Sequence, residues 1–474
     1  MLADTQENTR TAQVMALVRN RIERRILTPG ARLTSVRAMA EMTGFSKSTV
    51  VEAYERLVAE GVIRARPGSG FYIAAPLAPL ALAEVEPRVE REIDPLWMLR
   101  QSLALRPDAL KPGCGWLPEN WMPEQLMRKS LRALARNGSP TSITGYGPSQ
   151  GAEPLRQLIA RRLADQGVEA APSQVMLTDS GTHAVDLVCR FLLEPGDTVL
   201  VDDPGYFNFH ALLRAHRAKP VGIPYTRQGP DLAAFAQALA EHRPRLYITN
   251  SAMHNPTGAT LSAASAHRLL KLAEAHDLII VEDDIFADFE REAATRLAAF
   301  DGLDRVIRVG SFSKSLSGAV RCGHVAARPD WIAALIDLRI STGMTGSPLA
   351  ADLLHTALTD GGYRRHMDRV RGQLEQAMSR TIRRLKAVGV TPWIEPSAGL
   401  FLWARLPDGV DAVEVARQGL AQDVVFAPGN VFSVAHAATS YLRFNVAMME
   451  DERIFRVLSE ACETAYKSRA HTEL

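Results

Sequence analysis

The sequence predicts an α/β protein with a small, mostly helical head (residues 1–75) and a large body (residues 95–474) in which helices wrap a mostly parallel sheet. Three observations support this prediction. The head contains three short amphipathic helical patterns followed by a hairpin pattern. In the body, short β-rich runs alternate with helical stretches from residue 175 to residue 309, as in a parallel sheet. The stretch between them, residues 76–94, is rich in Ala, Pro and Glu and reads as a linker.

Composition places the chain among ordinary globular proteins. Its 474 residues are 46% hydrophobic and 23% charged, which excludes fibrous and largely disordered proteins. The net charge is +2, but residues 1–75 carry 11 basic and 7 acidic side chains. This local positive surplus favours a polyanion as a partner at one end of the chain.

Targeting and metal-binding signals are missing from the sequence. The N-terminal residues lack a positive stretch followed by an apolar run, and the apolar run at residues 74–83 is short and interrupted by two prolines. The four cysteines lie far apart, with no C-x-x-C pair and no histidines at metal-ligand spacing. We therefore predict a cytoplasmic protein with reduced thiols, no membrane span and no metal site.

Three helices are expected in the head. Apolar residues recur on one stripe of residues 11–27 until a Pro-Gly pair ends the helix. Ser35 is a plausible N-cap for a short helix over residues 36–42. Ser46 caps the third helix, and Gly61 ends it.

A β-hairpin follows, with strands at residues 62–66 and 71–73 joined by residues 67–70. Three helices and a hairpin in this order form a winged helix-turn-helix. The stretch LTSVRAMAEMTGFSKSTVVEAYERLVAEGVIRARPGSGFYI resembles the GntR-type bacterial DNA-binding domain. Thr34 departs from the family, which usually has proline at that position.

The resemblance implies that the third helix enters the major groove with its N-terminal residues and that the hairpin forms a wing beside it. Lys47 is the best candidate for reading base edges. Alternative readings stay open, because Ser46 could act only as a cap and Arg64 and Arg66 could be solvated side chains at a strand edge. The DNA-binding candidates are Arg37, Ser46, Lys47, Ser48, Thr49, Arg64, Gly68, Ser69 and Gly70.

In the body, the most informative stretch is SFSKSLSGAVRCGH, residues 311–324, which follows a strand predicted at residues 306–309. Lys314 would lie in the loop after this strand, which enters a crevice at the edge of the sheet. Ser311 and Arg321 are near it in the sequence. An amine that attacks an aldehyde needs a lowered pKa, and a phosphate is bound by hydroxyls and arginine. The alternative is an ordinary surface lysine.

Three further motifs support a functional reading. Asp283 ends a predicted strand, and a carboxylate there can pair with a protonated pyridine nitrogen. Asn255, in HNPTG, could donate to a phenolic oxygen. The run DSGTH, residues 179–183, opens a helix after a strand, where the N–H groups of Gly181 and Thr182 favour a phosphate. Taken singly, these motifs could be a cap, a turn and a helix start.

Together, and in this order, the motifs resemble the fold-type I pyridoxal-phosphate enzymes of the aminotransferase class, from about residue 94 to the C-terminus. The resemblance implies that Lys314 forms a Schiff base with pyridoxal 5'-phosphate, that Asp283 pairs with the ring nitrogen and that Asn255 bonds the ring hydroxyl. It also implies that the phosphate is held by Ser180, Gly181, Thr182, Ser311 and Arg321.

The resemblance extends to three more residues and fails at one. Tyr206 stands where such enzymes stack an aromatic ring on the cofactor, although it could be a core aromatic at a strand end. Arg443 stands where the family grips a substrate carboxylate, and Tyr146 is expected to reach a phosphate across a dimer interface. Phe286 occupies the place of a tyrosine that usually donates to the ring hydroxyl. We therefore expect slow or absent transamination.

A GntR-type DNA-binding domain joined to an aminotransferase-like body resembles the MocR subfamily of bacterial regulators. The resemblance implies operator DNA, an amine, amino acid or vitamin B6 as effector, and a head-to-tail homodimer. The expected domains are the DNA-binding head at 1–75, the linker at 76–94, a large cofactor-binding domain at 95–390 and a small α+β subdomain at 391–474.

Three function classes follow. The first is a transcriptional regulator that uses the cofactor as a sensor, and the second is a working aminotransferase with an accessory DNA-binding head. A structural protein with a vestigial site is disfavoured, because the chemistry-bearing residues are all present. The operator, the effector and the direction of regulation stay open.

Overall fold

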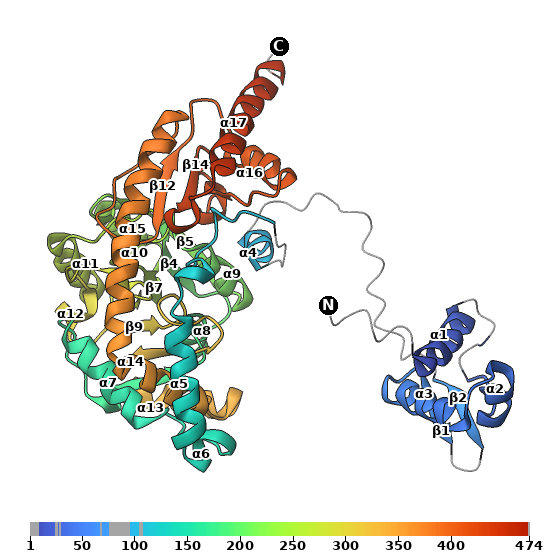
Figure 1. Cartoon of the computed structure of the whole chain (residues 1–474). Helices are drawn as coiled ribbons and strands as arrows, with labels where there is room; N and C mark the ends of the chain where they lie inside the picture. The colour runs from blue at the N-terminus through green and yellow to red at the C-terminus, as the bar shows by residue number, and fades with distance from the viewer. Residues whose placement is uncertain are drawn as a thin grey trace. The chain divides into compact units, whose positions relative to one another are not determined.

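A computed structural model describes residues 9–23, 27, 30–66, 69–74, 95–103 and 108–472. The chain divides into two compact units, residues 1–90 and 91–474, which contain the head and the body respectively (Figure 1). The predicted linker, residues 76–94, lies outside the described residues.

The head contains the elements that the sequence predicts. Its helices are α1 (Arg10–Glu23), α2 (Val36–Thr43) and α3 (Lys47–Ala59), and its hairpin is β1 (Ile63–Arg66) with β2 (Gly70–Ile73). The Ser35 and Ser46 side chains accept hydrogen bonds from backbone N–H groups in the first turns of α2 and α3, which confirms both predicted caps. Apolar side chains from all three helices and both strands form one core, including Val14, Val18, Met39, Val50, Tyr54, Leu57, Ile63 and Ile73.

The wing has a third strand segment that the sequence reading missed. The Leu33 N–H donates to the Phe71 carbonyl (2.8 Å), and the Ile73 N–H donates to the Ala31 carbonyl (2.9 Å). Arg32 is thereby paired with Tyr72 in antiparallel fashion, on the side of β2 opposite β1. The wing is a three-stranded sheet at this point.

The body is built on an eight-stranded sheet of order β3-β10-β9-β8-β7-β4-β5-β6. Strands β10 and β6 are antiparallel to their neighbours, and the other six run parallel to one another. The predicted mostly parallel sheet is therefore confirmed. The strands are β3 (Val175–Thr178), β4 (Thr198–Asp203), β5 (Lys219–Thr226), β6 (Gly229–Pro230), β7 (Leu246–Thr249), β8 (Ile279–Asp283), β9 (Val306–Ser311) and β10 (Gly323–Ala326).

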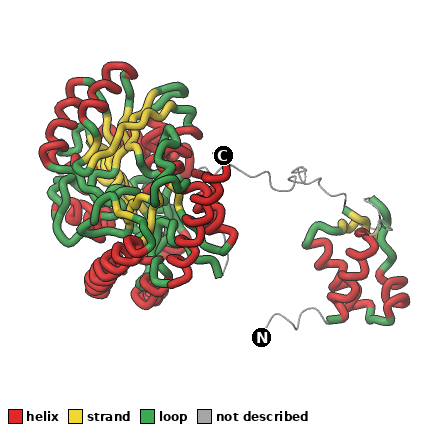
Figure 2. Tube along the Cα trace, turned by 90° about the horizontal axis from the view of Figure 1, so that it is seen from above, coloured by secondary structure: helices red, strands yellow, loops and turns green. Residues whose placement is uncertain are grey.

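Helices cover both faces of this sheet, as Figures 1 and 2 show. One face packs against α8 (Gly181–Leu192), α9 (Phe207–Ala215) and α13 (Pro329–Gly343). The other face packs against α7 (Glu153–Ala164), α10 (Leu232–His242), α11 (Ala263–Ala275) and α12 (Leu297–Asp301). Because side chains alternate along a strand, Val281 and Asp283 point to the α8 face, whereas Ile280 and Glu282 point to the α11 face.

A smaller antiparallel sheet of order β11-β12-β14-β13 lies in the C-terminal part of the body. The long helix α15 (Gly361–Ala387) leads into it. Its strands are β11 (Thr391–Pro392), β12 (Phe401–Arg405), β13 (Ala427–Pro428) and β14 (Tyr441–Asn445), and its helices are α16 (Ala412–Ala421) and α17 (Glu452–Thr472).

The remaining elements are short helices and single turns. The helices are α4 (Pro95–Leu103), α5 (Glu124–Asn137), α6 (Pro140–Thr144) and α14 (Pro348–Thr359). The turns are η1 (Glu119–Trp121), η2 (Pro172–Gln174), η3 (Ala287–Phe289), η4 (Gly429–Phe432) and η5 (Val446–Met448). Within the described residues, no helix has the length and apolar character needed to cross a bilayer.

Candidate functional site

A cavity opens at the carboxyl edge of the parallel strands, where α/β folds usually place ligands. Residues from the start of α8, the end of β8, the loop after β9 and helix α9 converge on it. Most residues predicted for the cofactor therefore lie together, although they are far apart in the sequence. The cavity is lined by Ser180, Gly181, Thr182, Val185, Tyr206, Asn208, Phe209, Leu212, Asp283, Ile285, Ser311, Ser313, Lys314 and Arg321.

Lys314 brings an amine into this cavity from the loop after β9. The surrounding protein excludes water from the amine and lowers the pKa of Lys314 to about 8. The Nζ atom lies 5.7 Å from the centre of the Trp116 ring. A larger fraction of this amine is neutral near pH 7 than of an ordinary lysine, and only the neutral form is nucleophilic.

Asp283 ends β8 and supplies a buried carboxylate to the same cavity. Its Oδ1 atom has no hydrogen-bond partner among the described residues. Burial raises the pKa of Asp283 to about 7. A buried carboxylate that keeps one oxygen unpartnered and faces a cavity suits a ligand that presents a positive N–H group.

The start of α8 offers the anion site. Ser180 is the N-cap of this helix and accepts a hydrogen bond from the His183 N–H (3.0 Å), so the alternative interpretation of this motif as a helix start is correct. Gly181 and Thr182 begin the helix, where unpaired N–H groups and the helix dipole favour an anion. Ser311 and Arg321 line the same cavity and add a hydroxyl and a guanidinium.

Arg443, on β14, is a buried guanidinium without a carboxylate partner among the described residues. It donates to Asn255 Oδ1 (2.8 Å) and to the Gly113 carbonyl (2.6 Å), and its Nε atom has no partner there. The rings of Phe401 and Phe432 flank it, with centres 4.4 Å and 4.8 Å from its Cζ atom. Burial lowers the pKa of Arg443 to about 10. Such a group is prepared for a carboxylate ligand.

Asn255 is fixed by this arginine and by its own neighbour. The adjacent His254 is fully buried and bonds Thr257 Oγ1 through Nδ1 (2.8 Å) and Asp202 Oδ2 through Nε2 (3.2 Å). Its ring stacks on Tyr225, with ring centres 3.7 Å apart. Because Asn255 Oδ1 accepts from Arg443, its amide nitrogen is left to donate to a ligand.

The sequence reading missed the segment at residues 113–116. Besides the Gly113 carbonyl, a Cβ added at Gly115 would lie 3.9 Å from Arg443 Nη2 and 4.0 Å from Lys314 Nζ. Asn445 holds this segment by donating to the Cys114 (3.1 Å) and Trp116 (2.7 Å) carbonyls. The run Gly-Cys-Gly-Trp was the available signal, since two glycines around a short turn often mark a close approach of the backbone to a ligand.

Two aromatic residues bear on the cofactor reading. Tyr206 lines the cavity, and burial raises the pKa of its hydroxyl to about 12, so it faces the cavity as a neutral aromatic. Phe286 is buried and packs edge-on against Phe401, with ring centres 5.2 Å apart. No hydroxyl is available at this position.

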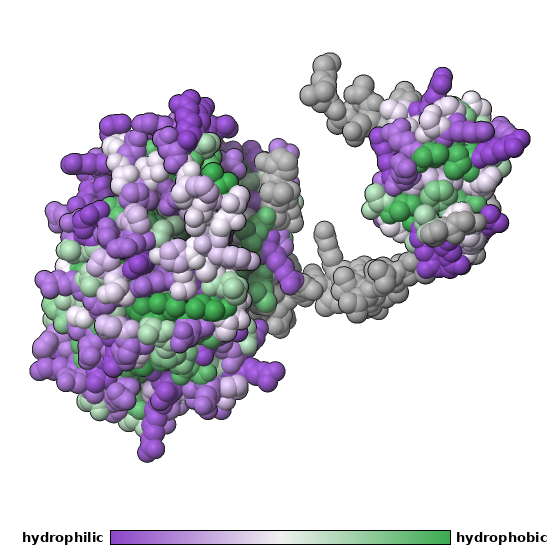
Figure 3. All heavy atoms as spheres, turned by 90° about the horizontal axis from the view of Figure 1, so that it is seen from below, coloured by the Kyte–Doolittle hydropathy of each residue, from purple (hydrophilic) through white to green (hydrophobic). Residues whose placement is uncertain are grey.

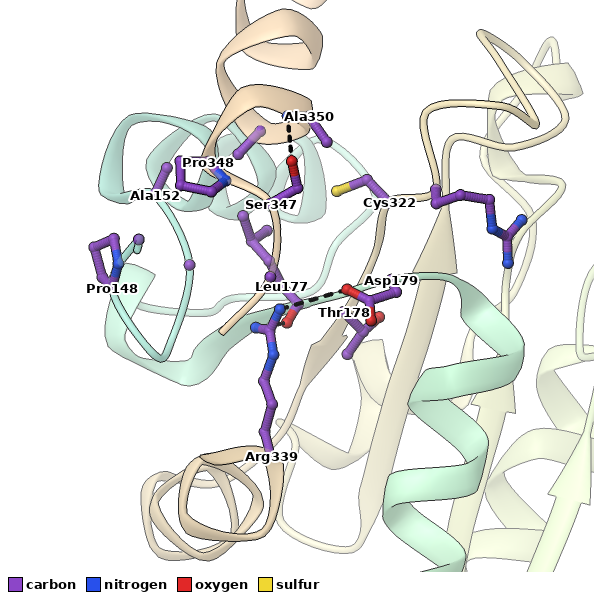
Figure 4. Close-up of a pocket in the computed structure, with 15 residues that line it drawn as sticks. Pro148, Ala152, Leu177, Thr178, Asp179, Cys322, Arg339, Ser347, Pro348 and Ala350 are labelled. Atoms are coloured by element: carbon purple, nitrogen blue, oxygen red, sulfur yellow. Dashed lines mark hydrogen bonds and ion pairs between the residues drawn. The ribbon is translucent and has the colours of Figure 1, made fainter. Parts of the chain in front are cut away.

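Tyr146 lies outside the cavity, with 80% of its surface exposed. A second cavity lies near it in the sequence, between residues 147–152 and 346–351 (Figure 4). There Arg339 reaches towards Leu177 and Asp179, and donates to the Leu177 carbonyl. This arginine supports the chain just before Ser180. Of the predicted cofactor residues, Arg321 borders this cavity as well.

In the head, the predicted DNA-binding residues are exposed at the start of α3. Lys47 and Ser48 are exposed, and Thr49 is half-buried. The Ser46 hydroxyl lies 2.8 Å from Thr49 Oγ1 and 2.9 Å from Ser48 Oγ, so it is a cap within a small hydroxyl cluster. Arg37, on α2, makes an exposed ion pair with Glu41 (3.1 Å), which is weak enough to be exchanged for a phosphate.

The outer face of the wing carries three arginines. Arg32 and Arg64 flank Tyr72 from the two neighbouring strands, so the three side chains share one face. Arg66 lies over the Tyr72 ring, 4.6 Å from its centre. No ion pair joins these arginines to an acidic group among the described residues of the head.

The other wing residues are only partly described. Ser69 Oγ lies 2.5 Å from the Tyr72 hydroxyl, and Gly70 has a φ of +98° beside the Arg32 side chain. Gly68 lies outside the described residues. Arg32 was missed in the sequence because its strand segment is too short to show a hydrophobic alternation.

Comparisons with known proteins agree with both units. Residues 116–460 match the family model described as aminotransferase class I and II, and residues 10–73 match the model described as bacterial regulatory proteins, gntR family. The chain is 31% identical over 451 residues to the uncharacterized HTH-type transcriptional regulator YdcR of Escherichia coli, covering 93% of this chain and 96% of that protein.

Two further proteins extend the comparison. The chain is 29% identical over 410 residues to the probable rhizopine catabolism regulatory protein MocR of Rhizobium meliloti, covering 84% of this chain and 82% of that protein. The crystal structure of LysN, the alpha-aminoadipate aminotransferase of Thermus thermophilus, in complex with N-(5'-phosphopyridoxyl)-L-leucine, superposes with a TM-score of 0.71. The sequence identity is 25%, and the match covers 78% of this chain and 95% of that one.

Proposed function

Because the chain belongs to the aminotransferase class I and II family and joins that fold to a GntR-family domain, as MocR does, we propose that it is a transcriptional regulator whose body senses a small amine or amino acid through bound pyridoxal phosphate. One observation carries this proposal: similarity to a named transcriptional regulator runs through both units, over 93% of the chain. This similarity includes the head, which aminotransferase activity alone would leave unexplained. The proposed division of the chain remains 1–75, 76–94, 95–390 and 391–474.

The cavity of the body fits pyridoxal phosphate. Its unpartnered Asp283 oxygen suits a protonated ring nitrogen, and the start of α8 suits a phosphate. The amine of Lys314 lies in the same cavity and is the proposed point of covalent attachment. When bound, the cofactor supplies an aldehyde that captures amines and a ring that withdraws electrons.

Each remaining residue has a proposed task. Asn255 donates from its amide nitrogen to the ring hydroxyl, and Tyr206 covers one face of the ring. Ser180, with Gly181 and Thr182, binds the phosphate together with Ser311 and Arg321. Arg443 takes the carboxylate of an incoming amino acid, because it is a buried cation that lacks a carboxylate among the described residues.

The route from this cavity towards the head begins at α4, the first described helix of the body. It packs against α9 and η4. Helix α9 contributes Asn208, Phe209 and Leu212 to the cavity, and η4 contributes Phe432, which flanks Arg443. If a ligand moved α9 or η4, the packing of α4 against them would change. We propose that sensing acts through this contact.

We propose a homodimer that uses the face of the body formed by α5, α6, α13 and α14. Helix α14 packs on α5 and α6, and Figure 3 views this side of the body and shows hydrophobic residues gathered on it. Patches of exposed apolar residues usually mark interfaces. The exposed apolar side chains there are Leu131, Ile143, Tyr146, Ile340, Met344 and Leu349. Tyr146 would reach the phosphate site of the second copy.

The cofactor proposal is tested by the absorption spectrum of the purified full-length protein with added pyridoxal phosphate. We expect a visible band that borohydride removes and that Lys314→Ala lacks, whereas Lys271→Ala, on the exposed side of α11, keeps it. A wild-type protein that never develops the band would overturn the sensor mechanism.

DNA binding is tested by selecting duplexes from a random library and measuring affinity against salt concentration. Lys47→Ala should relax the selected sequence, because Lys47 is proposed to reach base edges. Arg32→Gln should leave the selected sequence intact and reduce the salt slope by about one, as expected for a lost phosphate contact. Wild-type affinity that is independent of sequence would contradict the proposal.

The second candidate function is an active aminotransferase. It is favoured by the retention of Lys314, Asp283, Asn255 and Arg443 in one region of the body and by the similarity to LysN. Sustained keto-acid production from an amino acid would support it. The absence of a hydroxyl at Phe286 speaks against rapid turnover.

A further inference from the structure

Asp288 joins three segments of the body at one carboxylate. Its Oδ2 atom accepts hydrogen bonds from Ser315 Oγ (2.8 Å) and from the Tyr363 hydroxyl (2.6 Å), and its Oδ1 atom pairs with Arg162. Asp288 itself lies on η3, five residues after Asp283. The carboxylate therefore ties the loop after β9 to α15, through Tyr363, and to α7, through Arg162.

Ser315 is held at a second atom by α15. The His366 ring bonds the Ser315 carbonyl through Nε2 (3.0 Å), while Arg369 donates to its Nδ1 atom (3.3 Å). Burial lowers the pKa of His366, so the ring is neutral near pH 7. Because Nδ1 accepts, Nε2 carries the proton and donates. Both the side chain and the carbonyl of Ser315 are thus fixed.

Lys314 directly precedes this fixed point. Its amine makes no ion pair with the described residues, and the Trp116 ring centre is 5.7 Å away. A long, flexible side chain that no ion pair holds at its end takes its direction largely from its backbone. The position of the amine in the cavity therefore depends on how firmly residues 314–315 are held.

We propose that Asp288 is a positioning residue, which fixes the main chain at Ser315 and thereby directs the Lys314 amine into the cavity. Asp288 does not line that cavity, so it acts through Ser315. The inference rests on the proposed function, in which the cofactor attaches at Lys314. It adds to that function a link between the attachment point and α15, the helix that leads into the C-terminal sheet.

The test uses the full-length cofactor-free protein and follows the visible band after pyridoxal phosphate is added. Ser315→Ala removes the bond between the loop and the carboxylate, and Asp288→Asn weakens the whole cluster. Both should slow formation of the band by about fivefold, the effect of one buried hydrogen bond, and shift the pH at which the band is half converted. Ser315→Ala makes the smaller change and keeps the test decisive if Asp288→Asn does not fold.

Tyr363→Phe is the matched control. It also removes one hydrogen bond to Asp288, but it leaves the hydrogen bond between Ser315 and Asp288 in place. The rate and the pH midpoint should then change by less than about twofold, even if the unfolding midpoint falls as much as in Ser315→Ala. Equal effects of Tyr363→Phe and Ser315→Ala on the band would overturn the inference by showing a general loosening. If the wild-type band is normal and neither Ser315→Ala nor Asp288→Asn alters it, the inference is wrong but the proposed function stands. If the wild type develops no band, both the proposed function and the inference are wrong.

Discussion

Two neighbouring aspartates at the end of β8 have opposite electrostatic environments, although both are buried. Asp284 points to the α11 face, where Arg296 pairs with it at 2.7 Å and Arg308 also contacts it. Burial alone would raise the pKa of Asp284, but the two arginines bring it below its usual value. Asp283 points to the cavity, where burial raises its pKa and the nearby charge of Lys314 offsets this effect only in part.

The pH dependence of stability should reveal the raised pKa of Asp283. With a pKa of about 7 when folded and 3.8 as its ordinary value, Asp283 keeps a proton that the unfolded chain has released. Stability of the cofactor-free protein therefore falls as pH rises through this window. Asp283→Asn removes this loss, so at pH 8 the variant should be more stable than wild type by on the order of 2–4 kcal/mol, and the difference should shrink towards pH 4. Denaturant unfolding at both pH values measures it.

Two results bear on the reading of Asp283. A constant difference between variant and wild type across this pH range would contradict the raised pKa. Added pyridoxal phosphate should stabilise wild type more than Asp283→Asn, since only the carboxylate can pair with a ring cation.

Restoring a hydroxyl at position 286 should change the chemistry of the bound cofactor. Phe286→Tyr adds a donor where the resemblance to fold-type I enzymes leads us to expect one, and donation to the ring oxygen favours its negative form. We expect the pH midpoint of the visible band to fall and transamination of a common amino acid to rise at least about tenfold. Phe289→Tyr, at another buried ring, is the control. An unchanged midpoint in Phe286→Tyr would mean that turnover is limited elsewhere.

At the scale of elements, the start of α3 decides between capping and DNA contact. The Ser46 side chain caps the helix by accepting from the Thr49 N–H (3.2 Å). Ser46→Ala should destabilise the head by about 1 kcal/mol, and Ser46→Asp should not, because aspartate is also a good cap. If Ser46 faces DNA, Ser46→Asp should nevertheless lose affinity for the selected duplex by about tenfold or more, through repulsion of phosphates. Full affinity in Ser46→Asp would assign Ser46 to capping alone.

Elements with a clear local signal could be predicted from the sequence. Helix α3 combines a capping serine with a regular apolar stripe, and β9 is a short β-branched run between turns, so both were found close to their observed bounds. The residues proposed for the site were also suggested by local patterns in large part, since Lys314 follows a recognisable strand and Asp283 ends one.

Other elements depend on contacts that no local pattern encodes. Strand β10 is four residues long and begins inside the stretch that was read as a loop motif. The Gly113 carbonyl reaches Arg443 across 330 residues of sequence. The hydrogen-bond partners of Ser315 come from η3 and α15, and the sequence of the loop alone does not predict them. Residues of this kind become visible only when the sheet has brought distant segments together.

At the scale of the whole molecule, the two units of the chain have separate hydrophobic cores. The head has its own core around Tyr54, Met39 and Leu57, and the body has cores on both faces of its large sheet. The head core is small, and small domains bury a smaller share of their surface than large ones. The two units should therefore differ in stability and respond to different ligands.

Calorimetry of the full-length protein tests this independence. A ligand stabilises only the unit that binds it, by about 2.7 kcal/mol at a concentration 100 times its dissociation constant. Pyridoxal phosphate should therefore raise the transition of the body and leave that of the head in place, whereas the selected DNA duplex should raise the transition of the head. If DNA also raises the body transition only when the amine effector is present, the two sites are coupled, as a sensor requires. A single transition that shifts equally with either ligand would contradict two independent units. If DNA never changes the body transition, with or without the effector, the two sites are not coupled, and the sensor proposal is contradicted.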